Sequence, residues 1–176
     1  AADEVTPVSI DLSRRLKCYK MPEQNTGVIP GEGAAYFVVS NEKSKQSRLK
    51  ISFMQFNRAL EKELSVSTMH KDLIDNGLST VDAVLLGISG DANNDMLLQS
   101  LCDELYRDTP QIKYKHLFGE SHTSIATALF LVDYFMQTGT IPEVFRMNEK
   151  KSGSLQKVVI LNNYKNYHST LVLEKC

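Results

Sequence analysis

The sequence of 176 residues has no tryptophan, only three cysteines and no long apolar run. Cys18, Cys102 and Cys176 form no CxxC pair and no ligand cluster with the four histidines, which argues against a zinc site and a disulfide framework. No stretch approaches the roughly 20 apolar residues of a membrane span, and the N-terminus lacks the pattern of a signal peptide. We therefore expect no metal, no membrane span and a reducing, cytoplasmic setting.

An excess of charge of one sign is also missing. The chain carries 20 basic and 21 acidic residues, a formal net charge of -1. A balanced surface creates no field that would attract nucleic acid or an anionic membrane, so we expect neither as a partner. The chain also opens on Ala1-Ala2-Asp3 without an initiator methionine, which suggests a fragment, a processed product or an incompletely represented protein.

The hydrophobic content of 42% is enough for one domain with a core of ordinary size. Residues 1–30 are polar, contain Pro7, Pro22 and Pro30, and show little periodicity beyond a short helical pattern around Asp11 to Leu16. We interpret them as a connecting segment. The patterned region, 31–176, is the predicted domain.

Alternating strand and helix patterns fill this domain. Apolar runs predict strands at 34–40, 49–56, 81–88, 112–118, 157–162 and 169–174. The first two strands are expected to form a hairpin around the basic run 43–50, and the last two are expected to form an antiparallel pair at an edge. Helical spacing predicts helices at 67–76 and 94–106 and after the turn 119–121. The order predicts an α/β fold with a mixed, mostly parallel sheet covered by helices.

The stretch 115–135 (KHLFGESHTSIATALFLVDYF) places a histidine where a predicted strand turns into a helix. We expect His122 in the first helical turn, where unpaired amides and the helix dipole favour a neutral ring that can donate a hydrogen bond to an oxyanion. Ser121 and Thr123 are expected to cap this helix end. The alternative is that His122 is a capping-region residue without a chemical role.

Four landmarks follow one another along the chain in the order of a known family. They are 27–40 (GVIPGEGAAYFVVS), the segment 84–95 (VLLGISGDANND), the lysine, glycine and histidine of 115–128, and the turn 139–142 (GTIP). Together they resemble the C-terminal half of a β-ketoacyl-acyl-carrier-protein synthase. The resemblance covers nearly the whole chain, and its first landmark is the most specific.

This resemblance implies a thiolase-like half built on a five-stranded sheet, with residues 1–30 connecting it to a preceding half. It implies decarboxylating acyl condensation in fatty acid or polyketide synthesis, without a cofactor. In such a synthase a cysteine carries the acyl group, and two groups, usually histidines, stabilise the developing oxyanion. The implied partners are an acyl carrier protein and an N-terminal half or partner subunit, in a dimer.

The sequence departs from the family pattern at the positions whose residues carry out the chemistry. Gly87 stands where active synthases carry the first histidine, and the spacing from Lys115 to His122 is two residues longer than in the family. The glycine-rich loop is replaced by 162–168 (NNYKNYH), in which Tyr164 is a rough substitute for the aromatic gate. The nucleophilic cysteine is absent, since none of the three cysteines lies at a strand-to-helix elbow.

Three hypotheses remain from the sequence. The first is a C-terminal part of a synthase-like protein that is not catalytic as this chain alone. The second is an active divergent synthase in which His122, Lys115 and Glu120 are the catalytic residues, with Gly87, Tyr164 and Thr123 lining the substrate. The third is a non-catalytic partner subunit, like a chain-length factor, in a ketosynthase heterodimer.

Overall fold

A mixed sheet is the centre of the protein in the computed structural model, which describes residues 2–21, 26–58, 66–164 and 167–176. Among these residues the main sheet has five strands in the order β3-β7-β6-β4-β5. Strand β7 is antiparallel to both of its neighbours, whereas β6, β4 and β5 pair in parallel, so every strand except β7 runs in one direction. The bounds are β3 Leu49–Arg58, β4 Ala83–Gly87, β5 Gln111–Lys113, β6 Lys157–Tyr164 and β7 Tyr167–Lys175. The predicted mixed, mostly parallel five-stranded sheet is confirmed.

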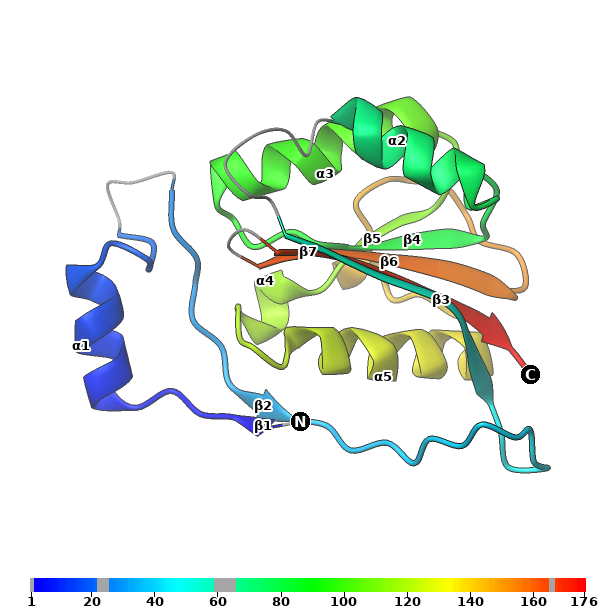
Figure 1. The fold of residues 1–176 in the computed structure, drawn as a ribbon, viewed down its shortest axis with the longest axis horizontal. Coiled ribbons are helices and arrows are strands. Elements are labelled where there is room, and N and C mark those ends of the chain that lie inside the picture. Colours follow the sequence, from blue (N-terminus) through cyan, green and yellow to red (C-terminus); the bar gives the residue numbers. More distant parts are fainter. Residues whose placement is uncertain (1, 22–25, 59–65, 165–166) are drawn as a thin grey trace.

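Helices cover both faces of this sheet (Figure 1). Helices α2 (Val66–Asp75) and α3 (Ala92–Leu105) lie on one face, and α5 (Ser124–Thr138) lies on the other. Because both faces are covered, β4 is a continuous apolar run with every residue buried. The remaining helices are α1 (Pro7–Arg15), the one-turn α4 (Lys115–Phe118) and the 3-10 helix η1 (Glu143–Phe145).

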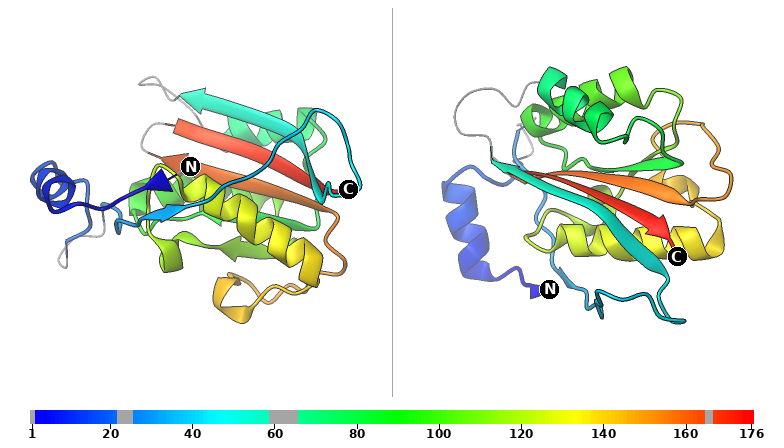
Figure 2. Two further views of the ribbon diagram at one scale, coloured as in Figure 1. Left: turned by 90° about the horizontal axis from the view of Figure 1, so that it is seen from below. Right: turned by 45° about the vertical axis from the view of Figure 1, so that its right-hand side comes forward.

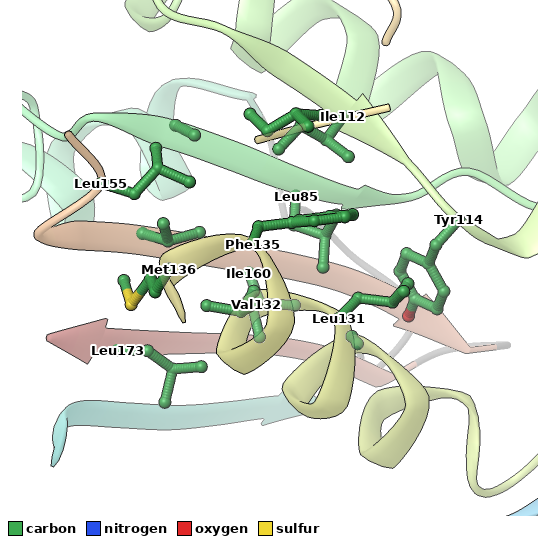
Figure 3. Packing of buried hydrophobic residues seen from close by; sticks show 14 of the residues in the cluster. Leu85, Ile112, Tyr114, Leu131, Val132, Phe135, Met136, Leu155, Ile160 and Leu173 are labelled. Carbon is green, nitrogen blue, oxygen red and sulfur yellow. The ribbon is translucent and has the colours of Figure 1, made fainter. Parts of the chain in front are cut away.

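Two apolar clusters result, one on each face of the sheet. Under α5, Val132 and Phe135 pack with Leu85 of β4 and Ile160 of β6 (Figure 3). Under α2 and α3, the side chains come from alternate positions of the same strands, including Val84. Successive side chains of a strand point to opposite faces, so each central strand contributes to both clusters.

The helix ends have ordinary capping residues. Asp91 is the N-cap of α3, and its carboxylate accepts hydrogen bonds from the amides of Asn93 and Asn94. Gly139 ends α5 in the left-handed conformation with φ of 67°, and Gly77 follows α2 with the same φ. These glycines explain why α5 ends at Thr138 and why α2 does not continue beyond 76.

The predicted hairpin between 34–40 and 49–56 is wrong. Strand β2 is only Gly33–Ala34, and it pairs with β1 (Ala2–Asp3) rather than with β3. Residues 35–40 lie outside any strand, and β3 pairs instead with β7. The apolar run 34–40 has strand propensity, but the ladder on β3 is formed by β7, which brings a complementary buried face from the end of the chain. The pair β6-β7 is accordingly internal, not at an edge.

The predicted strand 112–118 is also too long. Strand β5 ends at Lys113, and Lys115 begins the short helix α4, because its side chain turns inward to a buried partner rather than continuing the ladder. Thr123 is the N-cap of α5, so His122 precedes the helix instead of lying in its first turn. Thr123 makes no side-chain cap, and the predicted capping by this residue is therefore wrong.

The N-terminal region lies beside this layered body (Figure 2). Helix α1 and the strand pair β1-β2 precede the long segment that leads to β3. Among the described residues, no helix is long and apolar enough to cross a bilayer. The same residues contain no group of three or more His, Cys, Asp or Glu side chains placed to hold a metal ion.

Candidate functional site

Three of the site residues predicted from the sequence lie where parallel strands end. Gly87 ends β4, Lys115 follows β5, and Tyr164 ends β6. The carboxyl ends of parallel strands meet at one edge of the sheet, which is the usual place for ligands in open α/β folds. The predicted site residues therefore lie at one edge of the sheet, although the contacts there differ from the expected ones.

A buried ion pair is the main feature of this edge. The Nζ of Lys115 lies 2.6 Å from Oε2 of Glu120, and the two side chains are 0% and 4% exposed. The same Nζ donates to the backbone oxygen of Asn163 at 3.0 Å. Ser124 Oγ donates to the other carboxylate oxygen of Glu120 at 3.2 Å. Both charges thus have hydrogen-bond partners besides each other, which helps a buried pair to be tolerated.

Burial works against both charges of this pair. Removal from water lowers the pKa of Lys115 and raises the pKa of Glu120. Each charge opposes the effect on the other, because opposite charges at this distance favour the ionised forms. Each charge therefore stabilises the ionised form of the other. Loss of either partner would leave a buried charge without its counter-charge.

Asn163 connects the ion pair to two further elements. Its side-chain nitrogen donates to the backbone oxygen of Asn94 at 3.0 Å, and its side-chain oxygen contacts Nδ1 of His168 on β7. Burial lowers the pKa of His168, which favours the neutral ring that can donate to this oxygen. His168 is thus a hydrogen-bonded histidine that lies at the site.

Asp95 closes the adjacent loop after β4. Its two carboxylate oxygens accept hydrogen bonds from the amides of Ser89 and Gly90 at 2.9 Å and 2.7 Å. Burial nevertheless raises the pKa of this carboxyl, while those amide bonds and the Lys115 charge act in the opposite direction. Asp95 thus fixes the loop beside the ion pair from inside α3.

Gly87 packs against a neighbouring side chain instead of facing open space. A Cβ at this position would clash with the side-chain oxygen of Asn162 and lie 3.1 Å from its Cα. That oxygen accepts a hydrogen bond from the Tyr114 hydroxyl at 3.3 Å. The Tyr114–Asn162 pair therefore takes up the space beside Gly87 into which a side chain at this position would extend.

The segment around Gly31 crosses this site, and its backbone packs closely on the backbone of Phe118 and Gly119. A Cβ on Gly31 would lie 2.8 Å from Cα of Gly119 and would clash with the carbonyl of Phe118. The amide of Gly31 donates to the backbone oxygen of Glu120 at 2.8 Å, and Thr123 Oγ1 donates to Gly33 at 3.3 Å. Glycine is thus required here by close approach, and Thr123 holds the crossing segment rather than a helix amide.

His122 and Tyr164 form a separate, more exposed pair. The Tyr164 hydroxyl lies 3.1 Å from Nε2 of His122, and the ring centroids are 4.8 Å apart. His122 is solvent-exposed, whereas Lys115 and Glu120 are buried. The structure therefore joins Lys115 to Glu120 and His122 to Tyr164, and it does not bring the three predicted catalytic side chains into one hydrogen-bonded unit.

Several residues of the site were not among the sequence candidates. They are the partners of the ion pair and of Gly87: Asp95, Tyr114, Ser124, Asn162, Asn163 and His168. The polar dipeptide Asn162-Asn163, directly after the apolar run 158–161, was the available signal for two of them. Lys165 and Asn166 of the predicted loop lie outside the described residues.

A surface hollow of about 700 Å³ lies elsewhere, at the amino ends of β4 and β5. It is lined by His70, Ser79, Asp103, Glu104, Leu105, Arg107, Asp108 and Thr109. This hollow is open and polar, and it contains none of the residues described above. We therefore place the candidate site at the carboxyl edge, on the grounds of its buried charged groups and their shifted pKa values.

Comparison with solved structures defines the fold class. The ketosynthase/chain length factor of ishigamide matches over 99% of this chain with a TM-score of 0.69 and 14% sequence identity. A β-ketoacyl synthase from Burkholderia phymatum matches over 99% with a TM-score of 0.67 and 13% identity. No protein-family model matches the sequence, and no curated protein sequence is significantly similar to it.

A third structure is a type II polyketide synthase acyl carrier protein in complex with its ketosynthase bound to the hexaketide. It matches over 99% of this chain with a TM-score of 0.69 and 14% identity. This chain spans 52–54% of the length of the three matched chains. The protein thus has a thiolase-like fold and corresponds in extent to about half of a ketosynthase chain, as the sequence resemblance implies.

Proposed function

We propose that this chain is the C-terminal part of a 3-oxoacyl-acyl-carrier-protein synthase-like protein, that residues 1–30 link it to a preceding half, and that it is not catalytic alone. The observation that carries the proposal is the loss of the oxyanion donors from a fold that matches about half of a ketosynthase. Gly87 has no side chain, and Asn162 takes up the space beside it.

The second donor position is altered in a different way. The spacing from Lys115 to His122 exceeds the family spacing by two residues, so the family's histidine position corresponds to Glu120. Glu120 accepts hydrogen bonds from Lys115 and Ser124 through its two carboxylate oxygens. A carboxylate next to a developing oxyanion opposes its charge, and the neighbouring ammonium group is already neutralised. This supports a structural role for the pair.

A chain-length-factor-like partner subunit is the alternative function. It is favoured by the likeness to a ketosynthase/chain length factor structure and by the same loss of donors. Both proposals expect an acyl carrier protein and a second ketosynthase-like half or subunit as partners, in a dimer. An active divergent synthase would need His122, Lys115 and Glu120 to act together, whereas His122 is exposed and pairs with Tyr164.

Acyl transfer distinguishes these functions. The native protein, isolated with the chains that accompany it, is incubated with an acyl carrier protein bearing an acyl thioester and then analysed by mass spectrometry of peptides. We expect no acyl group on Cys18, Cys102 or Cys176, because burial raises the pKa of Cys102 to about 12 and none of the three lies at a strand-to-helix elbow.

The location of the acyl group then decides between the two proposals. An acyl thioester on a cysteine outside residues 1–176 of this chain, within the same polypeptide, supports the synthase half. An acyl thioester on a separate subunit supports the chain-length-factor-like partner. A stoichiometric acyl thioester on one of the three cysteines of this chain would contradict both.

A further inference from the structure

Helix α1 is held mainly by contacts among its own residues. Its start has a reciprocal capping box, in which Thr6 Oγ1 accepts from the amide of Ser9 and Ser9 Oγ accepts from the amide of Thr6. Asp11 and Arg15, four residues apart, form an ion pair at 2.9 Å. No residue of α1 is buried. A helix of nine residues is marginal on such local contacts alone, because most helices gain stability by burying an apolar side.

The apolar side of α1 is exposed to solvent. Val8, Leu12 and Leu16 follow one another at intervals of four residues, which places them in a row along one side of the helix. The exposed fractions of these three residues are 78%, 56% and 65%. The helix itself lies beside the layered body of the protein (Figure 1). An exposed row of aliphatic side chains on a helix is the pattern of a surface that packs against a partner.

Charge is distributed unevenly along α1 and the residues that flank it. Glu4 precedes the helix and is exposed. The opposite end carries four exposed basic residues, which are Arg14, Arg15, Lys17 and Lys20. Asp11 and Arg15 border the apolar row on the same side, because each of them precedes a residue of the row, Leu12 or Leu16, by one position. The helix therefore has an acidic start, an apolar row and a basic end.

We propose that α1 pairs antiparallel with α1 of a second copy of this chain. Pairing about a two-fold axis at Leu12 places Val8 of each copy opposite Leu16 of the other, so the apolar row complements itself. The same arrangement brings Asp11 of one copy within reach of Arg15 of the other. It also brings the acidic start of each helix to the basic end of its partner. Because both copies use the same surface, the contact closes on two copies.

Other arrangements fit the charges of α1 less well. A parallel pair of helices would place like charges together at both ends. An anionic lipid surface would attract the basic end but repel Glu4 and Asp11, and three aliphatic side chains provide little apolar area for insertion. The contact through α1 goes beyond the dimer of the proposed function, which names no surface, and it depends on the properties of this helix alone.

Analytical ultracentrifugation of the 176-residue chain measures this contact. The apolar row is small compared with standard interfaces, so we expect a monomer–dimer equilibrium with a dissociation constant of about 10–100 µM. Leu12→Asp should raise this constant about 100-fold, because a charge would be buried at the centre of the contact. Leu117→Asp is the matched control, since Leu117 is 49% exposed and lies on α4. This control variant should dimerise like the wild type.

An exchange of charges tests whether α1 meets α1. Asp11→Arg makes both flanking positions basic, and Arg15→Glu makes both acidic, so each variant alone should dimerise about 10-fold more weakly than the wild type. An equimolar mixture of the two variants should recover dimers, because each copy then offers the opposite charge. Native mass spectrometry identifies the mixed dimer by its mass. At concentrations well below the dissociation constant, all of these variants should melt like the wild type, because the substituted side chains are exposed.

Several results would overturn the contact through α1. One is a wild-type chain that stays monomeric at about 1 mM. Another is dimerisation of Leu12→Asp at the wild-type strength, which would assign the dimer to a different surface. A mixture of Asp11→Arg and Arg15→Glu without mixed dimers would exclude the pairing of the two helices. A monomeric chain that co-sediments with vesicles of phosphatidylcholine and phosphatidylglycerol would assign α1 to an anionic lipid surface instead. Acyl transfer tests the proposed function separately from all of these.

Discussion

The carboxyl edge of the sheet and the segment 36–39 depart from ordinary burial in opposite ways. At the edge, Lys115 and Glu120 are charged and buried, and each has several partners. In the segment, Tyr36 and Val38 are apolar and exposed, without backbone hydrogen bonds among the described residues. The first region has its partners within this chain, whereas the second has no backbone partner among the described residues.

This difference bears on what each region does. A catalytic site normally keeps at least one polar group free for its substrate, whereas a structural ion pair uses its donors and acceptors internally. The contacts of Lys115 and Glu120 are of the second kind. We therefore expect mutations at this edge to lower the stability of the fold, and mutations in the exposed segment 36–39 to change it little.

The largest expected effect is at the ion pair. Glu120→Ala leaves the Lys115 ammonium group buried without its carboxylate and should lower the free energy of unfolding by about 3–5 kcal/mol. Urea unfolding followed by circular dichroism measures this loss. The double variant Lys115→Met with Glu120→Leu removes both charges and should be clearly more stable than Glu120→Ala. Equal stability of wild type and Glu120→Ala would refute a structural role for the pair.

A smaller loss is expected where the N-terminal segment crosses the site. Gly31→Ala forces a methyl group into the backbone of Phe118 and Gly119 and should cost about 1–3 kcal/mol. Gly33→Ala is the control, since a Cβ on Gly33 meets nothing within 4 Å. The midpoints of urea unfolding compare the two. If both variants have the same midpoint, the crossing is not closely packed in solution.

The buried histidine makes stability depend on pH. The pKa of His168 is lowered by burial from 6.5, so the unfolded chain binds a proton that the folded chain resists. Stability should therefore fall as pH decreases from about 7 to about 5. The His168→Gln variant should lose this part of the pH dependence. Parallel curves of unfolding free energy against pH for the two proteins would contradict the assignment.

The smallest effect is expected in the exposed segment. Tyr36→Ser in the isolated chain removes a side chain that is 83% exposed, so unfolding should change by no more than about 0.5 kcal/mol. Thermal melting monitored by circular dichroism is sufficient. A loss as large as that of Gly31→Ala would mean that residues 36–39 already pack on this chain, and the contrast between the two regions would fail.

The sequence predicted those elements whose periodicity is set by the sheet and its helices. The buried runs at β4 and β6 and the helices α2, α3 and α5 appear where apolar spacing placed them. The errors fall at 34–40 and 112–118, where strand-like side chains are present but the strand partner is not decided locally. Propensity describes a side chain, whereas pairing depends on which distant strand is available.

The sequence named several residues of the candidate site but not their contacts. Gly87 ends β4 and Lys115 follows β5, and the sheet order brings these two strand ends to one edge. The sequence did not predict that Glu120 would turn back to Lys115, five residues earlier in the chain. Nor did it predict that Asn162 of β6 would pack on Gly87 of β4. Long-range side-chain pairing of this kind is visible only once the sheet order is known.

Release of carbon dioxide from malonyl-acyl carrier protein tests the central claim most directly. The isolated chain and its His122→Ala variant are each incubated with this thioester, and the product is compared with a protein-free blank. We predict no release above the blank from either protein, because Gly87 provides no donor and Lys115 is paired with Glu120. Release by the isolated chain that is abolished in His122→Ala would contradict this account and establish a catalytic site.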